Sequence, residues 1–142
     1  MKNRFAAYAI AFIHKNNKVL FVKRSDKAPF SPGYYSLVGG LLEKDEPFKQ
    51  ALARELHEEI GVTVNESDLH FVHMFHRNGS EHEMVVAVFE CTTFQGEPFN
   101  KEPEKHSEII WANLDNLPEL IIPAHRSVLQ LIMQKQFYSE QP

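Results

Sequence analysis

Cysteine is nearly absent from this chain, with Cys91 as its single example. One cysteine cannot form an internal disulfide and offers no thiolate pair to zinc, so we expect a reducing, cytoplasmic location and a buried Cys91 in a strand. An excess of basic residues is also missing, because the formal net charge is −4. Proteins that bind long nucleic acids normally present a basic face, and we therefore expect no nucleic acid polymer as a partner.

Long apolar runs are missing as well. The N-terminal segment, residues 1–15, starts with basic residues and turns apolar, but it is too short to span a bilayer and has no small-residue cleavage site. It is predicted to be a strand, and no membrane partner is expected. The 142 residues, 43% of them apolar, are enough to bury one core. A single domain over residues 1–142 is therefore predicted.

The stretch from Gly39 to Val62 concentrates carboxylates on one predicted helix. An α-helix turns about 100° per residue, so Glu55, Glu58 and Glu59 fall within an arc of roughly 100°. Like charges at this spacing repel one another, which favours a bound cation. Oxygen ligands without cysteine suit Mg²⁺, with Mn²⁺ as a substitute, and a phosphate-containing substrate. A solvated acidic face explains the same spacing, and spacing alone does not separate the two interpretations.

A neighbouring face of this helix is apolar. Its apolar residues recur every four positions, at Phe48, Leu52, Leu56 and Ile60. Pro47 suits a first helical turn and Gly61 suits the left-handed residue after a helix end, so we predict a helix over residues 47–60. Gly39 and Gly40 allow a tight turn before it, where backbone groups can approach an ion or a phosphate.

This stretch resembles the signature of the Nudix hydrolases, G-x5-E-x7-R-E-U-x-E-E-x-G-U, in which U is a bulky aliphatic residue. The matching residues are Gly40, Glu46, Arg54, Glu55, Leu56, Glu58, Glu59, Gly61 and Val62. A match at every specified position is far more specific than a lone short glycine motif. The resemblance implies an α/β (α+β) fold, namely a Nudix-like α/β/α sandwich with a mixed β-sheet.

The resemblance also implies roles for the acidic residues. Glu55 or Glu58 would take a proton from the attacking water, and Arg54, which can pair with Glu46 or with a member of the cluster, would orient the carboxylates. The implied metal ligands are Gly39, Glu55, Glu58, Glu59 and Glu102. Glu102 is included because residues 96–102, GEPFNKE, resemble the G-E-P-W-x-K-E segment of MutT-type nucleoside triphosphate pyrophosphohydrolases. An ordinary acidic loop remains the alternative for Glu102.

Substrate-binding residues are expected outside the motif. Residues 33–40 resemble the family segment G-x-W-x-L-P-G-G, with Tyr35 for tryptophan and Val38 for proline. Aromatic rings stack on any base, so Tyr34, Tyr35 and Phe30 are predicted on one side of the cleft, with a place in the core as the alternative for Tyr35. Leu120 and Ile121 are predicted to form the other wall, and the nearby polar candidates are Asn113, Asn116 and His125.

The implied reaction is hydrolysis of a nucleoside triphosphate to a monophosphate and pyrophosphate. Residues 77–80 carry neither the proline that marks ADP-ribose hydrolases nor the tyrosine that marks dinucleoside polyphosphate hydrolases. Ile121 occupies the approximate place of the asparagine that MutT enzymes use for oxidised guanine, so a specific 8-oxo-guanine enzyme is not expected. The alternatives are a hydrolase of another nucleoside diphosphate derivative and a sensor that binds nucleotides without cleaving them. A monomer or homodimer is expected.

Apolar patterning predicts the remaining elements. Strands are predicted at residues 5–14, 19–23, 69–75, 84–94 and 108–114, and a helix from Pro123 to about Phe137. Residues 15–18 and 78–79 have hairpin-turn compositions, and residues 25–35 are predicted to form a surface loop. Four histidines lie close together in the sequence: His70, His73, His76 and His82. A spacing of three on a strand puts successive side chains on opposite faces, so no histidine metal site is expected.

Overall fold

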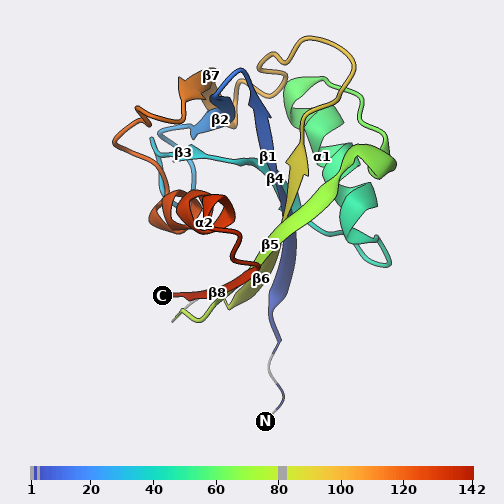
Figure 1. The fold of residues 1–142 in the computed structure, drawn as a ribbon, viewed down its shortest axis with the longest axis vertical. Coiled ribbons are helices and arrows are strands. Elements are labelled where there is room, and N and C mark those ends of the chain that lie inside the picture. The colour runs from blue at the N-terminus through green and yellow to red at the C-terminus, as the bar shows by residue number, and fades with distance from the viewer. Residues whose placement is uncertain (1, 3, 80–82) are drawn as a thin grey trace.

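The computed structural model describes residues 2, 4–79 and 83–142. Its strands are β1 (Ala6–Lys15), β2 (Lys18–Arg24), β3 (Tyr35–Ser36), β4 (Val38–Leu41), β5 (His70–Arg77), β6 (Met84–Cys91), β7 (His106–Asn113) and β8 (Tyr138–Gln141). Its helices are α1 (Phe48–Ile60), the short 3-10 helix η1 (Glu66–Asp68) and α2 (Pro123–Met133). Figure 1 shows their arrangement. None of the helices in these ranges is long and apolar enough to cross a membrane.

Strand β1 lies at the centre of the sheet and joins its two halves. It runs parallel to β6 and antiparallel to β4, and it pairs with β2 only at its end, where His14 lies opposite Val19. The strand order is β3-β2-β1-β6-β5-β8, while β7 pairs with β2. The predicted mixed sheet is therefore confirmed.

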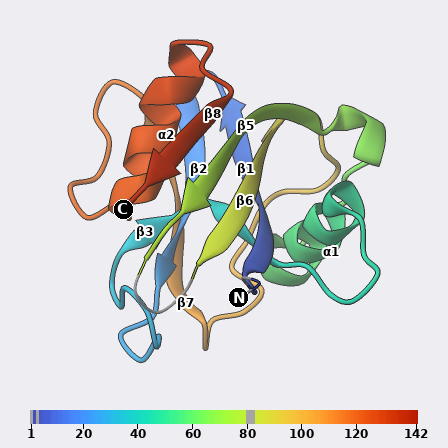
Figure 2. The ribbon, with the colours of Figure 1, turned by 90° about the horizontal axis from the view of Figure 1, so that it is seen from below.

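Alternation along β1 divides the core into two layers, because successive strand residues point to opposite faces. Ala9, Ala11 and Ile13 belong to the layer beneath α1, whereas Ile10 and Phe12 belong to the layer beneath α2. In Figure 2 the two helices lie on opposite sides of the strands. The predicted α/β/α sandwich is confirmed.

Both predicted hairpins are present. Asn16 and Asn17 connect β1 to β2 with positive φ values of 54° and 62°, which asparagine tolerates better than most residues. Strands β5 and β6 are antiparallel, although their connection includes residues 80–82, among them the candidate His82, which lie outside the described residues. Cys91, in β6, is buried as expected.

The end of α2 differs from the prediction. The sequence predicts a helix to about Phe137, but α2 ends at Met133 and the following residues enter β8. Lys135 has a left-handed φ of 62°, and a right-handed α-helix cannot continue through a residue in this conformation. Beyond it, the N–H of Met74 in β5 donates to the carbonyl of Phe137. Because the partner strand is available only in the folded chain, local periodicity carried the predicted helix too far.

Candidate active site

Helix α1 carries the predicted acidic residues, and its apolar face holds it on the sheet. Leu52, Leu56 and Ile60 are fully buried, as their spacing predicts. The helix begins at Phe48, one residue later than predicted, and ends before Gly61, whose φ of 73° is left-handed. The acidic face is therefore held in place by the buried side of the helix and by the backbone cap at Gly61.

Arg54 is the centre of a hydrogen-bond network among the carboxylates. Its Nε and Nη2 atoms donate to the two oxygens of Glu46 at 2.7 and 2.8 Å. Its Nη1 atom donates to Glu55 at 2.9 Å and to Glu58 at 3.3 Å. The bonds from Arg54 lower the pKa of Glu46 to about 2. Arg54 therefore pairs with Glu46 and with the cluster at the same time.

The helix carboxylates differ in their environments. The side chain of Glu55 is 12% exposed, whereas that of Glu58 is 50% exposed. Burial raises the pKa of Glu55, and the hydrogen bond from Arg54 acts in the opposite direction. Glu58 thus faces solvent, while Glu55 is held between the core and Arg54.

Glu59 is the most deeply buried carboxylate of α1, and it borders a cavity. Burial raises the pKa of Glu59 to about 8, and the charges of Glu55 and Glu102 act in the same direction. Lys105 and the backbone N–H of Gly39 oppose this shift. The local positive charge therefore only partly compensates the carboxylates around Glu59.

The loop of residues 96–105 brings Glu102 to the end of α1. The backbone N–H groups of Phe99 and Lys101 donate to the last carbonyls of the helix at 3.0 and 3.1 Å. Carbonyls in the last turn of a helix have no partner within the helix, so the loop satisfies groups that would otherwise need water. This docking explains why the Glu102 charge reaches Glu59 across a long stretch of sequence.

The two glycines before the helix are required by close approaches of other groups. A Cβ atom at Gly40 would lie 2.6 Å from the carboxyl group of Glu55, and one at Gly39 would lie 2.1 Å from the carbonyl oxygen of Ala9. The contact at Gly39 is with backbone, so only glycine fits there, whereas a side chain at Gly40 would require the Glu55 carboxyl group to move. Both glycines lie in strand β4 and not in the predicted tight turn, and this strand lies directly against the acidic residues.

The carboxylates around Glu59 suit a hard divalent cation in their chemistry. Among the described residues, no three histidine, cysteine or acidic side chains are gathered closely enough to hold an ion together, and Arg54 contacts Glu55 and Glu58 instead. However, the Oε1 atom of Glu102 is buried without a hydrogen-bond partner in the described part of the chain. Burying a carboxylate oxygen beside like charges costs stability unless a cation or a water molecule binds to that oxygen. The donor set therefore fits a divalent metal.

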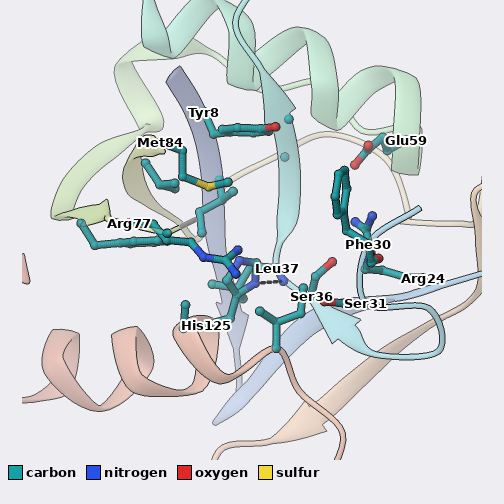
Figure 3. Close-up of a pocket in the computed structure, with 18 of the residues that line it drawn as sticks. Tyr8, Arg24, Phe30, Ser31, Ser36, Leu37, Glu59, Arg77, Met84 and His125 are labelled. Carbon is teal, nitrogen blue, oxygen red and sulfur yellow. Dashed lines mark hydrogen bonds between the residues drawn. The ribbon is translucent and has the colours of Figure 1, made fainter. Parts of the chain in front are cut away.

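A cavity of about 600 Å³ opens beside Glu59 on the α2 side of the sheet. Its walls come from β1, β4, β5, β6, the first turn of α2 and the loop after β2. Figure 3 shows Glu59 and Phe30 on one side of the cavity and Arg77 on the other, with His125 below. This volume is typical of a small-molecule site, so one end of such a ligand would meet the acidic residues.

The structure places two predicted substrate residues away from this cavity. Neither Tyr34 nor Tyr35 lines it. The hydroxyl of Tyr35 donates to Glu108, and this bond raises the pKa of Tyr35 to about 12. Its neighbour Ser36 lines the cavity instead. Because side chains alternate along a strand, only one of the two residues of β3 can point inward.

The wall predicted from Leu120 and Ile121 is formed instead by the next residue, Ile122. Ile121 is 2% exposed in the core beneath α2, and its neighbour Ile122 lines the cavity. Leu120 is 52% exposed and does not line it. Phe30, by contrast, is a lining residue as predicted.

Several lining residues were not among the predictions. Tyr8 shares a face of β1 with Ile10, and this alternation is a sequence signal that could have identified it. Arg77 and Met84 lie opposite each other where β5 and β6 meet, and only the strand register brings them together. Sequence patterns contain no signal for that register.

The fold and the site define a class of protein: an α/β/α sandwich in which a glycine-containing strand and a carboxylate-bearing helix border a cavity. The family model described as the NUDIX domain matches residues 2–132, and the chain belongs to this family. Members of the family are pyrophosphohydrolases that generally use divalent metals. The predicted family is confirmed.

Relatives of this chain differ in their named substrates. The NAD-capped RNA hydrolase NudC of Stutzerimonas stutzeri is 28% identical over 131 residues, which are 92% of this chain and 44% of that protein. The ADP-ribose pyrophosphatase of Methanocaldococcus jannaschii is 30% identical over 122 residues, which are 86% of this chain and 69% of that protein. The CTP pyrophosphohydrolase of Escherichia coli is 28% identical over 127 residues, which are 87% of either protein. The chain thus spans less than half of NudC.

A solved structure supports the same family. The crystal structure of the MutT NUDIX hydrolase from Burkholderia pseudomallei matches with a TM-score of 0.83 at 28% identity, and the match covers 90% of this chain and 98% of that one. The fold of this chain is therefore that of a MutT-like Nudix domain.

Proposed function

We propose that this protein hydrolyses a nucleoside triphosphate to a nucleoside monophosphate and pyrophosphate with the help of Mg²⁺, for which Mn²⁺ can substitute. The observation that carries the proposal is one cavity of about 600 Å³ that is lined by the acidic residue Glu59 and also by apolar side chains such as Phe75 and Met84. A nucleotide has the matching division into an anionic end, which a cation can bridge to carboxylates, and a flat base that apolar side chains accept.

The proposed metal ligands are the carbonyl of Gly39 and the carboxylates of Glu55, Glu58, Glu59 and Glu102. The buried Oε1 atom of Glu102 and the raised pKa of Glu59 support this assignment, because both carboxylates lack full compensation by protein cations in the described residues. When bound, the metal supplies charge neutralisation for phosphate oxygens and a lowered pKa for a coordinated water.

Arg54 and Glu58 would act on the water and on the carboxylates. One oxygen of Glu58 accepts a bond from Arg54, and the side chain is half exposed, so its other oxygen is available to take a proton. Glu55 is the second candidate for this role, and burial brings its pKa closer to neutrality. Arg54 would orient both residues through the bonds it already makes, which reduces the loss of freedom in the reaction.

Other substrates are the main competing functions. The archaeal relative is named an ADP-ribose pyrophosphatase, but residues 77–80 of this chain lack the proline associated with that substrate. The NudC relative is named for capped RNA, whereas the net charge of −4 argues against binding an RNA chain. A nucleotide sensor without activity is disfavoured because a binder needs no proton acceptor beside its ligand, and this motif keeps its carboxylates.

A substrate panel tests the proposal. Formation of the nucleoside monophosphate would be measured by ion-exchange chromatography for the common nucleoside triphosphates, ADP-ribose and NAD, with Mg²⁺ and with chelator, because hydrolysis of each of these substrates yields a monophosphate. We expect hydrolysis of triphosphates that chelator abolishes and Mn²⁺ restores. Faster hydrolysis of ADP-ribose or NAD than of every triphosphate would overturn the substrate class, and nucleotide binding without turnover would favour the sensor.

A further inference from the structure

His125 lies in the first turn of α2 and borders the cavity away from Glu59. Its Nδ1 atom accepts a hydrogen bond from the backbone N–H of Leu37 at 3.0 Å, which is drawn in Figure 3. A neutral imidazole whose Nδ1 atom accepts must carry its proton on Nε2. Burial, with help from the charges of Arg24 and Arg77, lowers the pKa of His125 to about 4, so the ring is neutral at physiological pH.

The Nε2–H group of His125 is consequently a donor of fixed identity. Within the described residues it has no hydrogen-bond partner. The Leu37 bond also fixes the orientation of the ring, since rotation would cost a buried backbone N–H its acceptor. A donor that is oriented, and that borders a cavity, is suited to reading an acceptor on a ligand.

Arg77 supplies a second donor on the same part of the cavity wall. Its guanidinium points toward His125 and Leu37 in Figure 3. No carboxylate forms an ion pair with Arg77 among the residues that the structure describes. Arginine has only donors, and its planar fork suits two adjacent acceptors. This end of the cavity therefore presents donors from two elements, whereas Glu59 is at the other end.

The proposed function sets the direction in which a nucleotide would lie. Its phosphates would meet the carboxylate end through the metal, so the atoms of the base farthest from the sugar would reach the donors. In guanine O6 is one of these atoms, N7 lies beside it on the same edge of the base, and both are acceptors. Adenine and cytosine place an amino group, which is a donor, at the corresponding position.

We propose that the Nε2–H group of His125, together with the guanidinium of Arg77, reads the O6 and N7 edge of guanine and makes this protein selective for guanine nucleotides. The inference rests on the proposed function for the orientation of the ligand. His125 is a specificity-determining residue in this proposal and has no role in the chemistry. The same donors oppose 8-oxo-guanine, because its N7 carries a hydrogen and would face Arg77 or His125 as a donor.

Equilibrium binding of nucleoside monophosphates with Mg²⁺ tests the inference without any hydrolysis, because a monophosphate has no anhydride bond to cleave. Titration calorimetry would compare GMP with AMP, CMP, 7-deaza-GMP and 8-oxo-GMP. A good two-donor contact discriminates by about ten- to a hundredfold. We expect GMP to bind at least about tenfold more tightly than AMP or CMP, and 7-deaza-GMP and 8-oxo-GMP to lose most of that advantage.

The variant H125N separates base reading from a structural role. The Oδ1 atom of asparagine can occupy the place of the histidine Nδ1 and keep the Leu37 bond, but its amide does not extend as far as Nε2. We expect H125N to fold with an unchanged thermal midpoint and to reduce the preference for GMP to less than about threefold. The exposed His70 of β5 provides the matched control, and H70N should keep the full preference.

The second donor is tested with R77Q, which should reduce the preference for GMP while leaving AMP binding within about twofold. Equal binding of GMP and AMP by the wild type would overturn the inference, as would a preference that survives in both variants. Triphosphate hydrolysis without base preference would leave the proposed function intact and remove only this inference. A preference for GMP in a protein that hydrolyses no triphosphate would support the inference and contradict the proposed function.

Discussion

Arg54 donates two hydrogen bonds to Glu46, which lies eight residues earlier in the sequence. One bond comes from Nε at 2.7 Å and the other from Nη2 at 2.8 Å. The same guanidinium reaches Glu55 and Glu58 through Nη1. One side chain thus fixes the relative positions of three carboxylates, and Glu46 anchors it without entering the cavity.

The first prediction concerns this anchor. Arg54→Lys should lower turnover by on the order of tenfold to a hundredfold, because an ammonium group cannot hold Glu46 with two bonds and also reach the cluster. Thermal unfolding should change little. Steady-state kinetics with Mg²⁺ and a melting curve provide the test, and turnover within twofold of wild type would show that the network does not position the carboxylates.

The second prediction concerns the exposed carboxylate of the helix. Glu58→Gln should lower turnover by at least about a hundredfold, since the amide can neither take a proton nor hold a metal as a carboxylate does. Glu66→Gln, an exposed change in η1, is the matched control and should retain full activity. Equal rates for the two variants would remove Glu58 from the proposed site.

The third prediction concerns stability and pH without metal. The pKa of Glu59 is raised from 4.5 to about 8, so the folded protein binds an extra proton between these values and loses stability as pH rises through this window. Glu59→Gln removes that term. We compare the free energy of unfolding of the variant with that of wild type, both in chelator. The variant's advantage over wild type should be larger at pH 8 than at pH 5 by more than about 1 kcal/mol. Urea titrations at the two pH values measure this, and parallel behaviour of both proteins would contradict it.

The fourth prediction concerns the products. A nucleoside triphosphate should yield a monophosphate and pyrophosphate, because the family resemblance implies attack within the anhydride chain at the α-β linkage. Ion-exchange chromatography of early time points identifies the products, and a reaction in ¹⁸O-water shows which phosphorus is attacked. A nucleoside diphosphate as the first product would contradict the prediction.

The fifth prediction concerns the join between α1 and the loop that carries Glu102. Gly61→Ala should destabilise the protein by more than about 1 kcal/mol, because residue 61 has a φ of 73° and a Cβ would lie 2.3 Å from the ring of Phe99. Gly79→Ala, where the nearest atom would be 3.9 Å away, is the control for stability. Similar melting temperatures for both variants would show that the loop can move away from residue 61 without a loss of stability.

Features that depend on short stretches of chain were predictable. The period of four that buries Leu52 and Leu56, and the left-handed Gly61 that ends the helix, are local properties that a sequence displays directly. The turn of Asn16 and Asn17 belongs to the same class, because its backbone preference is intrinsic to asparagine. Even the family assignment rested on the spacing within one turn and one helix.

Features that depend on distant partners were mispredicted or missed. Tyr35 was expected to face the substrate, but β3 turns its ring toward Glu108 and brings Ser36 to the cavity. Residues 134–137 were predicted to be helical, but they form a turn that leads into β8, for which β5 supplies the partner strand. Neither outcome could be read from local composition, since both depend on which neighbour is present after folding.

The sequence by itself determined the acidic helix, its caps and the nature of its chemistry, because these follow from residue types at helical spacing. Only the tertiary structure decided that the loop of residues 96–105 docks on the last carbonyls of α1, so that the charge of Glu102 reaches Glu59. It alone decided that Leu37 orients His125 at the far end of the cavity. The physical reason is that these contacts depend on backbone hydrogen bonds and strand register, which carry no signature in the identity of any single residue.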